Sequence, residues 1–172
     1  MLLFSHQVRF VLVGLLLITL LVGGGCTSAN NASGPGQAQT KFLDAAGMQK
    51  EYQAAAAKLK LPPSFSFPEK ANTGGAQSFE EGVGLSNAQN YWMAAWEIEW
   101  LEQRNKDEAR ARKALDVLKN EVPKSELMTK GCDEATRRFY AEYLKKAELG
   151  DPSGFQRDVE LNASSLLQSR PK

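Results

Sequence analysis

Apolar side chains recur at helical spacing between residues 85 and 122, and this stretch forms the centre of the chain. Ser86 followed by Gln89 is typical of a capping box, which favours a helix that begins near residue 86. Pro123 is expected to stop this helix, because proline lacks the amide hydrogen and clashes with the preceding turn. The pattern therefore predicts one long central helix over residues 86–122.

The predicted central helix is apolar on two sides. At 100° per residue, Ala94, Ile98 and Leu101 fall on one side. The opposite side carries Trp92, Trp96 and Trp100. Such a helix is expected between the layers of a domain, because a single covered face would leave the other in water. A charged stretch follows the tryptophans, and a break at Asn105 is the alternative to one continuous helix.

Shorter segments with helical periodicity flank the central helix. These segments are residues 41–60, 133–149 and 152–167. Residues 61–84 predict an extended loop, in which Phe65 and Phe67 alternate with serines between prolines and are expected to pack internally. The fold class that follows is all-α: a small domain of about four helices over residues 41–168, long enough to bury a core.

The N-terminal region predicts export from the cytoplasm. Phe10–Gly25 is an uncharged and mostly apolar run after Arg9, short for a spanning helix of about 20 residues and typical of a signal peptide. The small residues before Cys26 resemble the site at which bacterial lipoproteins are cleaved and lipidated. We therefore expect a signal peptide or anchor over 1–25, lipid attachment at Cys26 and a flexible tether over 26–40. An uncleaved single-span anchor and plain secretion are the alternatives.

Charge and histidine content narrow the classes of function. The 21 basic and 20 acidic residues nearly cancel, whereas a nucleic-acid-binding surface needs an excess of basic charge. His6 is the only histidine and lies in the predicted signal peptide. The rest of the chain therefore cannot build a Ser–His–Asp site or a histidine metal site. We expect no nucleic acid, no metal and no cofactor.

The tryptophan side of the central helix has three interpretations. Trp92, Trp96 and Trp100 pack into a core, form an exposed patch for a protein partner, or serve as a platform for sugar rings. Cys132 is either a small buried apolar residue, a reactive thiol or part of an intermolecular disulfide, and a disulfide with Cys26 is possible if Cys26 carries no lipid.

Three carboxylates lie among the tryptophans, at Glu97, Glu99 and Glu102. An acid next to an indole, with aromatic platforms for sugars, is one way in which a protein hydrolyses a glycan. At 100° per residue, however, the three side chains point in different directions. We therefore predict solvated or salt-bridged acids on an amphipathic helix.

The order of several short motifs resembles an uncharacterised family of small secreted or membrane-anchored proteins common in actinobacteria. The motifs are Phe67-Pro68-Glu69, Met93-Ala94-Ala95-Trp96, Gly150-Asp151-Pro152-Ser153-Gly154 and Asn162. The family has no assigned activity, so the resemblance implies a compartment and a fold. Its members often carry cysteines at the positions of Ala94 and Ala163. The resemblance thus implies that these two alanines are neighbours, with Cα atoms within about 7 Å, the reach of a disulfide.

These observations favour a non-enzymatic helical module that is anchored to the cell envelope and binds or spaces another component there. The expected partners are the membrane, through the N-terminal anchor, and another envelope protein. The alternative is a protein that binds or hydrolyses cell-wall glycan with the central helix, which is rich in tryptophan and glutamate.

Overall fold

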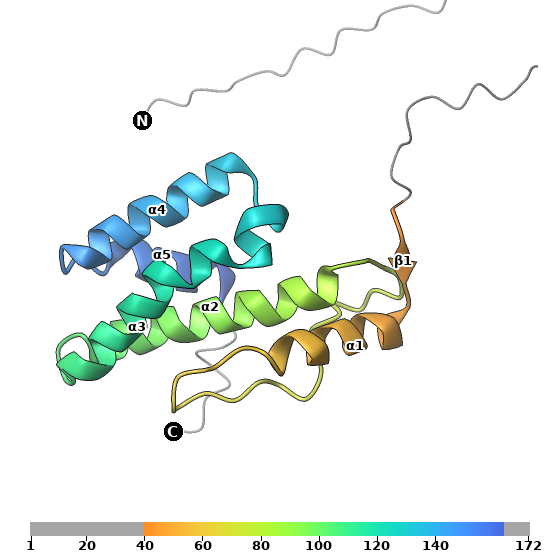
Figure 1. The fold of residues 1–172 in the computed structure, drawn as a ribbon, viewed down its shortest axis with the longest axis horizontal. Helices are drawn as coiled ribbons and strands as arrows, with labels where there is room; N and C mark the ends of the chain where they lie inside the picture. Colours follow the sequence, from red (N-terminus) through yellow and green to blue (C-terminus); the bar gives the residue numbers. More distant parts are fainter. Residues whose placement is uncertain (1–39, 164–172) are drawn as a thin grey trace, which may run out of the picture. The chain divides into compact units, whose positions relative to one another are not determined.

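The computed structural model describes residues 40–163, which form a small domain of mainly helical structure (Figure 1). The predicted signal peptide, Cys26 and the tether up to residue 39 lie outside the described residues, as does the predicted last helix beyond residue 163. The helices are α1 (Ala45–Ala56), α2 (Val83–Gln103), α3 (Glu108–Asn120), α4 (Glu134–Glu148) and α5 (Ser153–Asn162). Short 3-10 and π turns cover Val122–Lys124 and Leu127–Gly131. The predicted all-α class is confirmed.

A two-stranded antiparallel sheet closes the start of the domain. β1 (Phe42–Leu43) pairs with β2 (Phe79–Glu80), so the first residues of the predicted helix 41–60 are a strand instead. Asp44 then begins α1, because its carboxylate accepts a hydrogen bond from the amide of Gly47 at 2.7 Å. The sheet therefore joins the residues just before α1 to the residues just before α2.

Helix α2 begins three residues before the predicted capping box, at Val83. Its first amides are capped from another helix: the carboxylate of Glu51 in α1 accepts hydrogen bonds from the amides of Gly82 and Gly84 at 3.0–3.2 Å. The side chain of Gln89 binds the backbone amide of Leu127 at 2.6 Å instead of the start of its own helix. The start of α2 is thus set by a tertiary contact.

The prediction of one continuous helix over 86–122 is wrong, and the alternative break near Asn105 is present. Helix α2 ends at Gln103, and α3 begins after Asp107. The Asp107 carboxylate accepts a hydrogen bond from the amide of Arg110 at 3.0 Å and so caps α3. The turn lets α3 fold back onto α2 (Figure 1), which a straight helix could not do. The break therefore gives the domain a fifth α-helix.

Helix α2 lies in the middle of the domain, as its two apolar sides predict. It packs against α1, α3 and α5, while α4 packs against α5 and α3 (Figure 1). The largest core cluster lies on its tryptophan side, and a second one lies between α1 and the start of α2. Both apolar sides of α2 are therefore buried.

Two glycines permit the closest helix contacts. A Cβ atom on Gly84 would stand 2.2 Å from the carbonyl oxygen of Met48, so any side chain there would push α1 and α2 apart. A Cβ atom on Gly154 would stand 2.7 Å from the Cα atom of Tyr143, which places the same restriction on α4 and α5. Both positions require glycine for space, because neither contact is with a flexible side-chain end.

The predicted extended loop packs internally as a strap over residues 61–78. Phe67 lies between two tyrosine rings, with ring centroids 6.2 Å from Tyr52 and 5.3 Å from Tyr91. The hydroxyl of Tyr52 donates to the carbonyl of Pro68 at 3.0 Å, and that of Tyr91 donates to the carbonyl of Ser66 at 2.7 Å.

Of the helices within residues 40–163, none is both long and apolar enough to cross a membrane.

Candidate functional site

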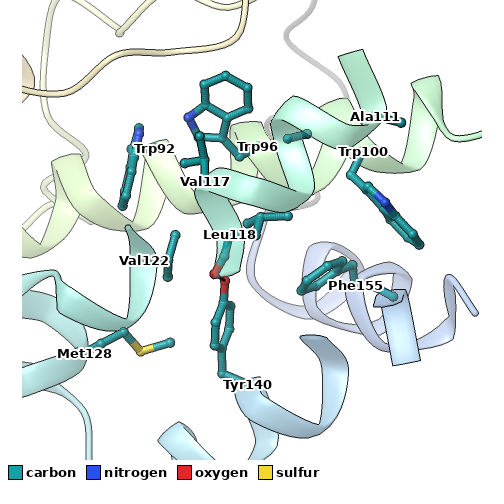
Figure 2. Close-up of a cluster of buried hydrophobic side chains, with 12 residues drawn as sticks. Trp92, Trp96, Trp100, Ala111, Val117, Leu118, Val122, Met128, Tyr140 and Phe155 are labelled. Carbon is teal, nitrogen blue, oxygen red and sulfur yellow. Dashed lines mark hydrogen bonds between the residues drawn. The ribbon is translucent and has the colours of Figure 1, made fainter. Parts of the chain in front are cut away.

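The three tryptophans lie in the core and form no exposed patch. Their exposed fractions are 3% for Trp92, 5% for Trp96 and 4% for Trp100. The indole nitrogens of Trp92 and Trp96 both donate to the carbonyl oxygen of Lys60 at 3.0 Å, and Trp100 packs edge-on against Phe155 (Figure 2). The predicted partner patch is wrong, and so is the glycan platform, because the returning helix α3 covers this side. Core packing, the first interpretation, is confirmed.

The glutamates around the tryptophans do not converge, as their spacing predicts. Glu99 is buried and forms an ion pair with Arg110 of α3, with N–O distances of 2.6 and 2.9 Å for the two nitrogens of the guanidinium. Glu102 is only half-buried, near the end of α2. The bidentate pair satisfies Glu99 fully, so this carboxylate joins α2 to α3 and is not available for chemistry.

Glu97 is different, because its carboxyl group is fully buried and no described residue donates a hydrogen bond to either oxygen. The group close to it is the carboxyl of Asp158 in α5. Burial raises the pKa of Glu97 well above its usual value of 4.5, and the charge and hydrogen bond of Asp158 raise this pKa further. Burial next to another carboxyl group therefore favours the protonated, neutral form of Glu97.

The protonated form explains how the two acids lie together. Two ionised carboxylates only accept hydrogen bonds, whereas a protonated Glu97 donates to Asp158. Asp158 is half-buried, and its Oδ1 atom accepts a second hydrogen bond from the side chain of Asn162 at 2.9 Å. Of the two carboxyl groups, that of Asp158 is the more exposed one, so it is the one that a ligand can reach.

Asp158 also lines a cleft of about 340 Å³ between α2, α4 and α5. We call it the α4–α5 cleft and define it by Met93, Met128, Phe139, Tyr143, Asp158 and Leu161. Two of its apolar side chains are unusually exposed: Phe139 at 51% and Leu161 at 60%. The cleft therefore combines apolar walls and an apolar rim with one carboxylate.

Two further ionisable groups of the cleft are held neutral. The hydroxyl of Tyr140 donates to the carbonyl of Leu118 at 2.7 Å (Figure 2), and burial raises the pKa of this phenol, with smaller contributions from Glu97 and Asp158. Cys132 is half-buried, and burial raises the pKa of its thiol too. A reactive cysteine needs a lowered pKa, so the thiol of Cys132 does not fit that interpretation.

Ala94 and Ala163 come together in one buried cluster with Ile98 and Val159, where α2 packs against α5. Both alanines also line a second hollow of about 390 Å³, which shares Asn162 with the α4–α5 cleft. The predicted proximity of the two helices is thus present, and the separation of the two Cα atoms within disulfide reach stays a prediction.

The sequence pattern did not indicate Asp158, the residue that makes Glu97 distinctive. A signal for Glu97 was available: it stands between Trp96 and Ile98 on a helix with two apolar sides, so burial on both flanks could have been expected. No comparable signal marks Asp158, which lies 61 residues further along the chain on a polar helix. Its partner is set by the packing of α5 against α2.

Fold and site together define a small all-α domain with an acidic, apolar-walled cleft. Among residues 40–163, no group of histidine, cysteine, aspartate or glutamate side chains is arranged to hold a metal ion. No protein-family model, no curated protein and no solved structure matches the chain.

Proposed function

We propose that the chain is a non-enzymatic binding module, held at the outer face of the cell membrane by a lipid on Cys26, and that its ligand binds in the α4–α5 cleft. The single observation that carries the binding role is the exposed apolar rim of Phe139 and Leu161 next to the carboxylate of Asp158. Apolar side chains gain free energy when a ligand removes them from water, and a carboxylate between them orients that ligand.

The geometry of the acid pair supports binding more than hydrolysis. A glycoside hydrolase holds two carboxyl groups roughly 5 to 9.5 Å apart, on either side of the bond that is cleaved. Glu97 instead lies next to Asp158 and has no exposed surface. A substrate could touch only Asp158, so the pair offers one charge and no second reachable group.

The anchored location rests on the N-terminal sequence. The near balance of 21 basic and 20 acidic residues disfavours an electrostatic grip on anionic lipid, whereas a lipid on Cys26 would hold the protein without one. Expressing the Cys26→Ser variant tests this part: it should lose the lipid mass and leave the membrane fraction. A variant that stays in the membrane fraction would contradict the lipid anchor.

Site-specific photo-crosslinking in intact cells tests the binding role. A benzoylphenylalanine at position 161 lies at the rim of the cleft, whereas one at position 149 replaces a leucine that is 80% exposed and outside the cleft. We expect a discrete crosslinked product from position 161 and none from position 149. Equal crosslinking at both positions, or none at either, would overturn the cleft as the binding surface.

A further inference from the structure

We propose that the ligand of the α4–α5 cleft carries an organic ammonium group on an apolar body, with the cation on the carboxylate of Asp158 and the apolar body between Phe139 and Leu161. This inference rests on the proposed function and names the chemical class of its ligand. Three features of the cleft support it: its charge, its unpaired anion and the nature of its walls.

The charge of the cleft matches a monovalent cation. Within the described part of the chain, Asp158 is the one acidic side chain that lines the cleft, because the neighbouring Glu97 is fully buried and has no exposed surface. A divalent metal ion would require several oxygen ligands, whereas the thioethers of Met93 and Met128 and apolar side chains make up most of the walls. One carboxylate in such surroundings suits a single positive charge with an organic body.

Asp158 also has no cation of its own among residues 40–163, where the ion pairs join other residues. Arg137 of α4 is engaged elsewhere, because its guanidinium donates to the backbone carbonyls of Met128 and Cys132. The side-chain amide of Asn162 donates a hydrogen bond to the Asp158 carboxylate, and the buried carboxyl group of Glu97 lies close to it. A bound ammonium group would complete its hydrogen bonds.

The walls of the α4–α5 cleft can pack against the alkyl groups that an organic ammonium ion carries. Phe139 and Tyr143 contribute aromatic rings, and cations bind favourably to aromatic faces within about 6 Å of the ring centre. Met93 and Met128 add flexible, polarisable side chains that adapt to ligands of different shape. An ammonium ion has both a charge for Asp158 and alkyl groups for these walls, which a bare metal ion lacks.

Methyl NMR of the full chain in dodecyl maltoside micelles, which carry no ammonium group, provides the test. With methionine labelled at the methyl carbon, Met93 and Met128 report on the cleft, while Met48 lies in the separate α1 cluster and serves as the internal control. Butylammonium and the uncharged 1-butanol are the probes. We expect saturable shifts of Met93 and Met128 but not of Met48, with about tenfold tighter binding of butylammonium.

Two variants form a matched pair of carboxylate deletions. Asp158→Asn should abolish the preference for butylammonium, whereas Asp116→Asn should keep it. Each aspartate accepts a hydrogen bond from an asparagine four residues later in its helix, at 2.9 Å from Asn162 and 2.8 Å from Asn120, so the deletions differ mainly in location. If Asp158→Asn does not fold, Leu161→Lys at the exposed rim should weaken butylammonium binding more than butanol binding, because the lysine repels the cation in addition to removing apolar surface.

Equal affinities for the two probes, or a preference that survives Asp158→Asn, would overturn the ammonium assignment. So would shifts as large at Met48 as in the cleft. The photo-crosslinking at position 161 separates this failure from that of the proposed function: a crosslink there without an ammonium preference keeps the binding role and rejects only the ligand class.

Discussion

Replacing Glu97 by glutamine should raise the free energy of unfolding at neutral pH and flatten its dependence on pH. The folded protein keeps Glu97 protonated, because its carboxyl is fully buried next to Asp158. The unfolded chain releases this proton near the usual pKa of 4.5. Glutamine has the same shape, needs no proton and donates an amide hydrogen to Asp158 in its place.

The sign and size of this effect follow from proton linkage. Because the pKa of Glu97 is raised in the folded state, this group does not lower the free energy of unfolding below pH 4.5. Above pH 4.5, the free energy of unfolding falls as the pH rises toward the folded pKa. Each pH unit in that window costs the wild type about 1.4 kcal/mol relative to the glutamine variant. The difference in unfolding free energy between the two proteins should therefore grow with pH above 5.

Urea unfolding followed by tryptophan fluorescence at several pH values above 5 measures the difference, since all three tryptophans are buried in the fold. This pH range lies above the titration of Asp133 and Asp151. Their pKa values are lowered in the fold, so the stability that they contribute is present above their usual pKa of 3.8 and is lost only at lower pH. Glu160→Gln, an exposed change of the same charge on α5, is the control. A difference between Glu97→Gln and wild type that stays constant with pH would refute a neutral, buried Glu97.

Three further changes test the packing. Gly84→Ala should lower the free energy of unfolding by about 3 kcal/mol, because its Cβ atom would collide with a carbonyl oxygen of α1, whereas Gly131→Ala, with no contact under 3.5 Å, should change it by less than about 0.5 kcal/mol in the same urea titration. Ala94→Cys with Ala163→Cys should oxidise to a disulfide that adds about 4 kcal/mol for a loop of roughly 70 residues, and a mapped peptide mass without that link would place the two helices too far apart. Arg110→Ala should lower the thermal midpoint sharply, because it leaves its buried glutamate partner without a cation, and an unchanged midpoint would contradict the importance of that pair.

Much of the fold could be predicted because it depends on local periodicity. The helix expected over 133–149 appears as Glu134–Glu148, with Asp133 as its cap. The expected start of the central helix at Ser86 was wrong, because Glu51 from α1 caps its first amides. A local motif gives no information on a cap that comes from a residue 31 positions away.

The site depended almost entirely on tertiary structure. The periodicity of α2 showed correctly that Glu97 and Glu99 point in different directions. It did not show whether either side chain is solvated or buried. Only the return of α3 gives Glu99 its Arg110 partner, and only the packing of α5 places Asp158 against Glu97. The same return of α3 buries Trp92, Trp96 and Trp100, which removed the predicted patch.

Local residue order specifies the helical class, the cap of α4 at Asp133 and the two apolar sides of α2, since each arises from residues within a few turns of one another. Packing between distant segments sets which helix covers each apolar side and where two carboxyl groups meet away from water. The physical reason is that the protonation of Glu97 and the charge of the cleft depend on burial and on neighbours distant in the chain. The pattern of a single helix carries no information about either.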